Sequence, residues 1–341
     1  MARAARAVRS DAVAALVVAA ILVVALAGCR GDRRGLPIVE PAVAGGDPRP
    51  PWEQIDRPSL AACGVCHLDV YGEWETSLHH RAWTNANVRD ETNDFAQSGC
   101  RPCHSPQPVL VTGLDRRPDY RDFNQPDGVH CLSCHGLSGS DGGVAASRTL
   151  PDAPCRPRFD PGFVSANSCW PCHEPTHHAY EEYDRSDAKA VGLRCADCHM
   201  QTVARGADRA GRSHGPNGGL NPDFVRRAVA WQCELEGGEL VVALRNRTGH
   251  KFPGEIPSRL FQVRVTVDGG EPRYVTLSKP RKDETRADDR LDVDETRALR
   301  FTVDAAASDV QVALLFKPFP LLPDEAAFVL GEWRSGEARA R

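Results

Sequence analysis

Five copies of the pattern Cys-x-x-Cys-His constrain this 341-residue chain more than any other feature of its sequence. In each copy, two thiols can add to the two vinyl groups of a haem, and the adjacent histidine is then held under the iron. Zinc knuckles and disulfides also use cysteine pairs, but neither requires a histidine after every second cysteine. We number the copies motif 1 to motif 5; they span residues 63–67, 100–104, 131–135, 169–173 and 195–199.

The motifs predict five covalently bound haem c groups. The expected thioether residues are Cys63, Cys66, Cys100, Cys103, Cys131, Cys134, Cys169, Cys172, Cys195 and Cys198. The expected proximal iron ligands are His67, His104, His135, His173 and His199.

A c-type haem iron usually takes a second axial ligand, which is methionine or histidine. The chain has two methionines: Met1 belongs to a predicted signal peptide, and Met200 directly follows His199, so it cannot reach the opposite face of that haem. Histidine is therefore the expected distal ligand. The candidates are His79, His80, His130, His177, His178, His214 and His250.

Not every candidate can act independently. His79/His80 and His177/His178 are sequence neighbours whose side chains point in different directions, so each pair is expected to supply one ligand. His130 stands beside Cys131, which is tied to its own haem, so this imidazole has to reach a neighbouring haem. Two histidine ligands predict low-potential irons without an open position, which favours electron transfer over catalysis.

The segment 59–230 carries too many attachment motifs for a core made of protein alone. We expect short helices and loops wrapped around the porphyrins, which supply most of the apolar mass. Within it, 71–77 and 180–186 share Tyr, Glu, an aromatic residue and Ser at matched offsets. We interpret this as a weak internal repeat of a haem-binding unit; chance similarity of two amphipathic turns is the alternative.

From about residue 231 the pattern changes to alternation of apolar and polar residues. Six segments are predicted as strands with one buried face: 239–244, 261–267, 273–277, 298–303, 310–316 and 326–333. Turns rich in Gly, Pro and Asp join them, so residues 231–341 are predicted to form a small all-β sandwich. The acidic run 288–295 is interpreted as a solvated loop, since its spacing matches no calcium loop. The expected fold class is α+β multidomain, a mostly helical and loop-rich multihaem domain followed by this sandwich.

His250 lies at the edge of the predicted sandwich, in the sequence Thr-Gly-His-Lys-Phe-Pro-Gly from 248 to 254. Gly249 and Pro253-Gly254 can fix an unusual backbone there. We therefore predict that the β-domain presses His250 onto a haem of the preceding domain.

The N-terminus predicts export. Three arginines precede an apolar run from Ala12 to Ala27, as in the basic and hydrophobic regions of a signal peptide. The sequence Leu-Ala-Gly-Cys at 26–29 resembles a bacterial lipobox, so residues 1–28 are expected to be a lipoprotein signal peptide and Cys29 the lipidation site. An uncleaved anchor helix is the alternative. Residues 29–58, rich in Pro and Gly, predict a flexible tether.

This N-terminus places the protein in the bacterial cell envelope, as a periplasmic or outer-membrane-associated lipoprotein. The formal net charge is −4, and because nucleic-acid binding needs a basic surface, no such partner is expected. Cys155 and Cys233 are expected to form a disulfide or to be two buried thiols.

Several short sequences are shared with a known group of proteins. They are Trp74-x-x-Ser77-x-His79, Gly128-Val129-x-Cys131-x-x-Cys134-His135-Gly136, Gly192-x-x-Cys195-x-x-Cys198-His199-Met200, Arg212-Ser-His214, Asn246-x-Thr248-Gly249-His250-x-Phe252-Pro253 and Asp289-Arg290-Leu291. On these residues, the chain from about 60 to 335 resembles the multihaem c-type cytochromes related to cytochrome c-554 and the hydroxylamine-oxidoreductase-like group, in the variety with a C-terminal β-domain.

The resemblance implies an extracytoplasmic electron carrier with closely stacked, mostly bis-His haems. It favours His79 over His80, and it supports His214 and His250 as distal ligands. The chain departs from the pattern at Pro253-Gly254-Glu255, where relatives tend to have Pro-Thr-Gly, and this affects the local turn rather than the ligand.

Electron transfer is the expected function, between a membrane quinol dehydrogenase or another periplasmic donor and a terminal reductase or outer-membrane cytochrome. The alternative is a haem oxidoreductase of a small nitrogen or sulfur compound, with one open haem. Pentahaem nitrite reductases typically use Cys-x-x-Cys-Lys at the active haem, whereas all five motifs here end in His. A redox-linked adhesion or scaffold role for the β-domain is a third class.

We expect five covalent haems per polypeptide, measured by intact mass and by haem absorbance after denaturation. Replacing both cysteines of motif 3 (Cys131→Ala with Cys134→Ala) removes one haem, because no thioether can then form. Cys155→Ala, outside the motifs, is the matched control and retains all five. Fewer than five haems on the unmodified chain contradict the assignment.

Overall fold

The computed structural model describes residues 60–137, 143–206, 209–281 and 283–336. All of them lie in one compact unit, residues 49–341. The predicted signal peptide, the lipidation site Cys29 and the predicted tether fall outside the described residues. Within the described ranges, no helix has both the length and the apolar character needed to cross a bilayer.

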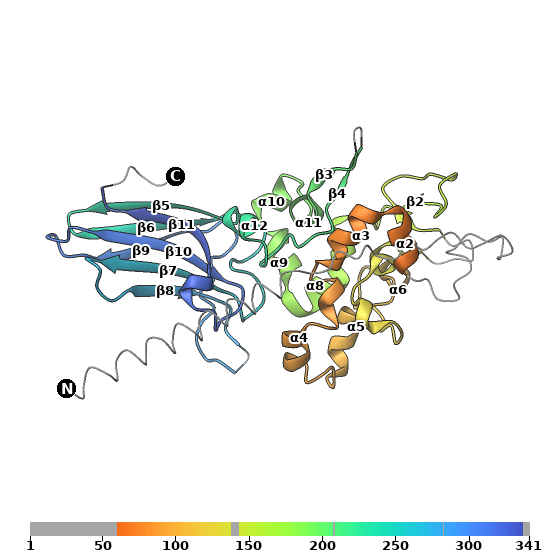
Figure 1. Cartoon of the computed structure of the whole chain (residues 1–341), viewed down its shortest axis with the longest axis horizontal. Helices are drawn as coiled ribbons and strands as arrows, with labels where there is room; N and C mark the ends of the chain where they lie inside the picture. The colour runs from red at the N-terminus through yellow and green to blue at the C-terminus, as the bar shows by residue number, and fades with distance from the viewer. Residues whose placement is uncertain (1–59, 138–142, 207–208, 282, 337–341) are drawn as a thin grey trace, which may run out of the picture. The chain divides into compact units, whose positions relative to one another are not determined.

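The motif-bearing segment is built from short helices (Figure 1). They are α2 (Leu60–Cys66), α3 (Leu68–Glu75), α4 (Ala86–Glu91), α5 (Arg101–His104), α6 (Val109–Thr112), α7 (Cys131–His135), α8 (Trp170–His177), α9 (Ala179–Asp184), α10 (Asp187–Ala190), α11 (Cys195–His199) and α12 (Pro222–Arg226). Two strand pairs accompany them, β1 (Ala145–Ala146) with β2 (Arg158–Phe159) and β3 (Thr202–Ala204) with β4 (Ala210–Arg212).

Every motif forms or adjoins one of these helices. The cysteines of motif 1 lie in α2, and the proximal histidines of the other motifs lie in α5, α7, α8 and α11. On a helix, residues three apart share a face, so both cysteines of a motif point to the same side. This is the arrangement that thioether attachment requires.

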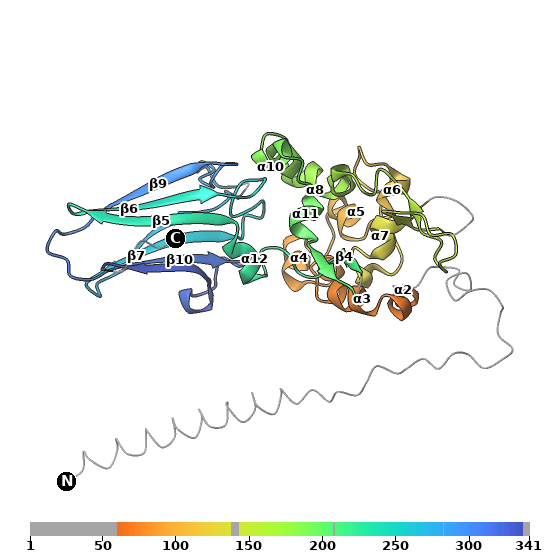
Figure 2. The same ribbon diagram turned by 90° about the horizontal axis from the view of Figure 1, so that it is seen from above.

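The β part consists of two sheets (Figure 2). Its strands are β5 (Val229–Glu236), β6 (Glu239–Asn246), β7 (Leu260–Val267), β8 (Arg273–Leu277), β9 (Thr296–Thr302), β10 (Val310–Lys317) and β11 (Phe328–Arg334). One sheet has the order β11-β10-β7-β8 and the other β5-β6-β9. All neighbouring strands in both sheets are antiparallel.

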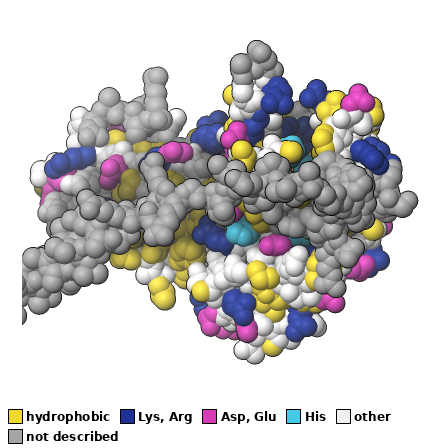
Figure 3. All heavy atoms as spheres, turned by 45° about the vertical axis from the view of Figure 1, so that its right-hand side comes forward, with side chains coloured by type: hydrophobic (Ala, Val, Ile, Leu, Met, Phe, Trp, Pro, Cys, Tyr) yellow, Lys and Arg dark blue, Asp and Glu magenta, His cyan; other side chains and the backbone are white. Residues whose placement is uncertain are grey.

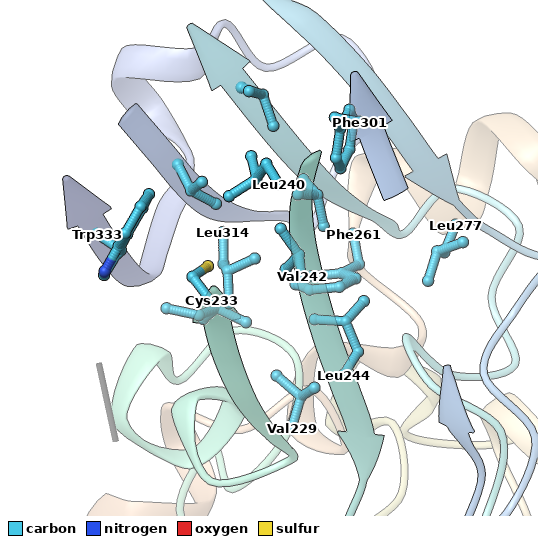
Figure 4. Packing of buried hydrophobic residues seen from close by; sticks show 14 of the residues in the cluster. Val229, Cys233, Leu240, Val242, Leu244, Phe261, Leu277, Phe301, Leu314 and Trp333 are labelled. Carbon is cyan, nitrogen blue, oxygen red and sulfur yellow. The ribbon is translucent and has the colours of Figure 1, made fainter. Parts of the chain in front are cut away.

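A single apolar core joins the two sheets (Figure 4). Leu240, Val242 and Leu244 of β6 alternate inward and are fully buried, as are Phe261 and Val263 of β7 in the other sheet. The alternation follows from the two-residue period of a strand, which sends every second side chain to one face. The predicted hydrophobic pattern therefore identifies the core of this part.

All six predicted strands are present, with ends shifted by a few residues. One further strand, β5, was not predicted and begins at Val229, just before the predicted domain boundary at 231. Its buried Val229 and Cys233 do alternate with more exposed residues. The alternation of apolar and polar residues was present in the sequence, but the predicted domain boundary at 231 lies within this strand.

The acidic run 288–295 is a loop between β8 and β9, but it is not solvated throughout as expected. Arg290 is 5% exposed and Leu291 is fully buried. Leu291 exchanges two backbone hydrogen bonds of 3.0 Å with Phe252. Arg290 pairs with Asp288 at 2.7 Å and with Glu255. The buried Leu291 and Arg290 therefore anchor this loop, together with acidic residues such as Asp289, which accepts the backbone N–H of Ser278 at 2.8 Å.

We expect Gly331→Ala to destabilise the β part by about 1–3 kcal/mol, the usual cost of overpacking. A Cβ at this position of β11 lies 2.2 Å from the ring of Trp231 on β5, in the facing sheet. Urea unfolding followed by far-ultraviolet circular dichroism measures the loss. Gly218→Ala is the control, because a Cβ there meets no atom within 4 Å. Equal stability of the two variants contradicts close contact of the sheets at Gly331.

Candidate haem-ligand sites

Three proximal histidines are oriented in the same way. The Nδ1 atom of His104 lies 2.7 Å from the backbone oxygen of Ala82, that of His135 2.8 Å from Ala145 and that of His199 2.9 Å from Asn217. A carbonyl only accepts, so each Nδ1 carries the proton and Nε2 keeps its lone pair for a metal.

A phenylalanine packs beside each of these rings. The ring centroids are 5.5 Å apart for Phe95 and His104, 4.6 Å for Phe163 and His135, and 5.1 Å for Phe224 and His199. The carbonyl fixes the tautomer and the phenylalanine limits rotation of the ring. Both kinds of partner lie outside the motifs, so the motifs alone did not predict them.

Three histidine pairs face each other at nearly the same separation. The ring centroids are 6.3 Å apart for His79 and His173, 6.4 Å for His135 and His214, and 6.2 Å for His199 and His250. Each pair joins a proximal histidine of a motif to a candidate distal histidine. The pairs thus belong to motif 4, motif 3 and motif 5.

This separation matches two imidazoles on opposite sides of one iron. A metal–imidazole bond is about 2.0 Å and the ring centroid lies about 1.1 Å beyond the nitrogen, which gives about 6.2 Å between trans centroids. Ring pairs such as Phe316 and Phe328 also lie 6.2 Å apart, so the assignment depends on both partners being imidazoles and on one of them belonging to a motif. The residues present therefore fit a bis-His haem at each of the three motifs.

The protonation states also suit metal binding. His135, His214 and His250 are half-buried; burial lowers the pKa of His135 and His214, and it lowers the pKa of His250 to about 4. These imidazoles are therefore neutral near pH 7, which is the form that coordinates iron. His214 and His250 direct Nδ1 at the backbone oxygens of Arg212 and Lys251, both at 3.0 Å, so they too present Nε2.

The other histidine candidates have different surroundings. His80 places Nδ1 3.0 Å from the oxygen of Glu75. His130 is buried, and its Nδ1 accepts from the backbone N–H of Ser133 at 3.1 Å, so in the neutral ring Nε2 carries the proton. The side chain of His178 is 66% exposed, beside Glu174. The side chain of His177 falls outside what the structure describes. Their predicted roles as ligands stay predictions.

His67 and His104 differ from the other proximal histidines. Among the described side chains, neither faces a second imidazole at the separation found for motifs 3, 4 and 5. Their distal ligands are therefore not assigned by ring pairing. On the face shown in Figure 3, histidine side chains are visible only as small areas between their neighbours.

Cysteines of different motifs also lie near one another. The thiol of Cys63 shifts in pKa because of the neighbouring thiol of Cys131, that of Cys103 because of Cys172, and that of Cys195 because of Cys169. These contacts bring motif 1 next to motif 3, motif 2 next to motif 4, and motif 4 next to motif 5. Nothing in the sequence predicted this order.

Cys155 and Cys233, the two described cysteines outside the motifs, are free thiols rather than a disulfide. Cys233 is buried in β5, and burial raises its pKa to about 12. Cys155 is half-buried, and burial raises its pKa as well. Both thiols are therefore protonated near neutral pH, and of the two alternatives left open, the free thiols are correct.

Comparisons with known proteins agree with this chemistry. Residues 62–136 match the family model for cytochrome c554 and c-prime. The structure is similar to a penta-heme cytochrome c552 from Thermochromatium tepidum, with a TM-score of 0.60 and 17% identity, over 80% of this chain and 97% of that chain.

Other comparisons add little. A family 56 carbohydrate-binding module that binds beta-1,3-glucan matches 31% of this chain and 95% of its own, at 8% identity and a TM-score of 0.18, which is too low to carry an argument. No match was found among curated proteins. The family match and the fold together support a multihaem c-type cytochrome with covalently bound haem c.

We expect His79→Ala, His214→Ala and His250→Ala each to convert one ferric haem from low-spin to high-spin, because each substitution removes one imidazole of a facing pair. Electron paramagnetic resonance (EPR) and visible absorption measure the change. His80→Ala, next to His79 but not facing a proximal histidine, is the control and leaves the spectra as they are. A low-spin spectrum in all three variants contradicts the ligand assignment.

Proposed function

We propose that this multihaem c-type cytochrome is an extracytoplasmic pentahaem electron carrier, which transfers electrons between redox partners through bis-His, low-potential haems. The observation that carries the proposal is the spacing of the three histidine pairs, 6.2–6.4 Å between ring centroids. A haem with both axial positions filled by protein exchanges electrons without binding a substrate at iron.

The haem number follows from the motifs. All five Cys-x-x-Cys-His copies are complete, and the solved structure with a similar fold is described as penta-heme. The haem supplies the redox centre, and this chain supplies attachment, axial ligands and a low-dielectric setting. Two imidazoles omit the methionine sulfur that raises the potential of a haem, so low potentials are expected.

The contacts between motif cysteines support a route for electrons. Motif 1 adjoins motif 3, and motif 4 adjoins both motif 2 and motif 5. Because each of these cysteines carries the edge of a porphyrin once it is attached, their proximity favours short steps between those haems. We therefore propose transfer within the group of motifs 2, 4 and 5 and within the pair of motifs 1 and 3.

In this proposal a haem-packed helical domain, residues 59–230, is followed by a β-sandwich, residues 231–341, that contributes a ligand. His250 stands in the loop after β6 and faces His199 of motif 5. Asn246 and Thr248 hold this loop, since their side chains donate to the backbone oxygen of His250 at 2.8 Å and 2.6 Å. The β part thus acts as a clamp on the motif 5 haem.

The proposed location is the bacterial cell envelope. It is supported by the sequence at 1–29, where a signal peptide ends at a lipobox cysteine, Cys29. The proposed partners are a quinol dehydrogenase, periplasmic or outer-membrane cytochromes and a terminal reductase. A lipid anchor with a Pro- and Gly-rich tether lets a carrier reach several partners at one membrane.

One observation favours the alternative function, a haem oxidoreductase for a small nitrogen or sulfur compound. Among the described side chains, His67 and His104 face no imidazole of the kind that completes the other three pairs. A haem of motif 1 or motif 2 with an open position is a site for a small ligand. His130 and one of the pair His177/His178 are the remaining candidates to close these two positions.

Titration of the ferric holoprotein with cyanide and with nitrite separates the two functions. A carrier with all axial positions filled shows no spectral response, because neither anion has a free iron to bind. The His250→Ala variant is the positive control, since it is expected to bind cyanide at one haem. A high-spin EPR signal in the unmodified protein that responds to either anion contradicts the carrier and supports the oxidoreductase.

A further inference from the structure

The internal repeat predicted from the sequence has a counterpart in the hydrogen bonds of the structure. Its first copy, Tyr71–Ser77, lies in α3 and the turn after it, and its second copy, Tyr180–Ser186, lies in α9 and the turn after it. Besides the tyrosines, the copies share a Glu position (Glu73, Glu182), an aromatic position (Trp74, Tyr183) and a Ser position (Ser77, Ser186).

The Ser position makes the same turn in both copies. The N–H of Ser77 donates to the oxygen of Trp74 at 2.9 Å, and that of Ser186 donates to the oxygen of Tyr183 at 3.0 Å. Each hydroxyl accepts a backbone N–H three residues later, at 3.2 Å in the first copy and 3.3 Å in the second. The copies therefore share local structure, which argues against chance similarity.

The aromatic side chain of each copy donates a hydrogen bond to the backbone just before a neighbouring motif. Nε1 of Trp74 donates to the backbone oxygen of Val129 at 2.9 Å, and the hydroxyl of Tyr183 donates to that of Leu193 at 2.5 Å. Each acceptor stands two residues before the first cysteine of a motif, motif 3 in one copy and motif 5 in the other. Each copy is thus hydrogen-bonded to the segment that leads into one haem-attachment motif.

The first Glu position is tied to a distal ligand. Oε2 of Glu73 accepts the backbone N–H of His214 at 2.8 Å. Arg205 donates to both carboxylate oxygens, at 2.8 Å and 2.6 Å. The guanidinium of Arg205 and the backbone of His214 therefore share this carboxylate, and both hydrogen bonds from Arg205 hold it in place.

The second Glu position makes the matching contact. Oε2 of Glu182 accepts the backbone N–H of Lys251, the residue after His250, at 2.8 Å. Its other oxygen lies 3.6 Å from Arg290. Glu182 is 6% exposed and Arg290 is 5% exposed, so the contact is buried. In both copies the glutamate accepts a backbone N–H from the loop of a predicted distal histidine. The arginines differ, because Arg205 donates hydrogen bonds to Glu73 whereas Arg290 lies beside Glu182 and donates to Asp288 and Glu255.

We propose that Glu73 and Glu182 are positioning residues for the distal iron ligands His214 and His250. In each copy, one helix then contacts both parts of the same proposed haem site. Its aromatic side chain is hydrogen-bonded to the backbone before the attachment motif, and its glutamate is hydrogen-bonded to the loop that carries the distal histidine. The inference rests on the proposed function, in which these two histidines bind the irons of motifs 3 and 5.

The distance along the chain between each distal histidine and its motif explains why its loop has to be held in place. His214 and His250 belong to segments far along the chain from their motifs, and a histidine on an unrestrained loop can rotate or withdraw from the metal. A charge-assisted hydrogen bond to the backbone at the ligand fixes the loop without using the imidazole itself. Removal of the hydrogen bonds that orient a metal ligand commonly changes metal affinity and activity.

The test compares glutamate and histidine variants of the holoprotein. Glu73→Ala is expected to add a high-spin ferric EPR signal of up to one haem per chain, with unchanged covalent haem content and circular dichroism. Glu73→Gln keeps an oxygen acceptor but loses the charge, so it is expected to give a smaller signal. Glu182→Ala and Glu182→Gln are expected to act in the same way at motif 5.

Double variants show whether each glutamate acts through its histidine. Glu73→Ala with His214→Ala is expected to give no more high-spin signal than His214→Ala alone, because the ligand is already lost. Glu73→Ala with His250→Ala is expected to give the sum of the two single effects, since different haems are affected. Glu75→Ala and Glu181→Ala replace exposed glutamates of the same two helices and serve as controls.

Three results overturn the inference in distinguishable ways. If His214→Ala and His250→Ala leave the spectra low-spin, the ligand assignment itself fails, and the positioning role fails with it. If they convert one haem each but the glutamate variants do not, only the positioning role fails. If Glu73→Ala impairs folding, the Glu73→Gln variant decides: unchanged EPR g-values together with an unchanged midpoint potential contradict the role.

Discussion

Axial coordination is the constraint on which the rest of this structure depends. Two imidazoles can share one iron only if their rings are held about 6.2 Å apart with the nitrogen lone pairs facing. Three histidine pairs meet this condition, and in each the second ring comes from a distant part of the chain. His79 precedes its partner by 94 residues, whereas His214 and His250 follow theirs by 79 and 51. Each haem site therefore joins remote segments.

This requirement explains why much of the polar hydrogen bonding serves the ligands. Backbone oxygens hold Nδ1 of proximal and distal histidines alike, and aromatic rings pack beside the proximal ones. The helices themselves are short, and isolated helices of this length are not stable in water. Their stability has to come from packing and from the sites they form, so ligand placement and folding depend on each other.

The sequence predicted the parts with a strict chemical or periodic signature. Alternation of apolar residues gave six strands of the β part, and the motifs predict the attachment cysteines and proximal histidines. It named His79, His214 and His250 as ligands, but it could not say which motif each one faces, because that depends on how distant loops pack. The role of Ala145 or Asn217 was also hidden, since any residue offers a backbone oxygen. β5 was missed because the domain boundary was placed within it.

The internal repeat connects these observations. A motif, a short helix and a turn recur, and in both copies the helix contacts a second motif through an aromatic side chain and a distal-ligand loop through a glutamate. The contacts of motif cysteines repeat as well, with Cys63 near Cys131 in one copy and Cys169 near Cys195 in the other. In the proposed assignment, two adjacent haem sites form one structural unit. The copies differ in where the predicted distal ligand comes from: the segment just after β4 in the first and the loop after β6 in the second. The proposed scaffold is therefore repeated while the source of the second ligand varies, and in this way a β-domain can contribute to a haem site.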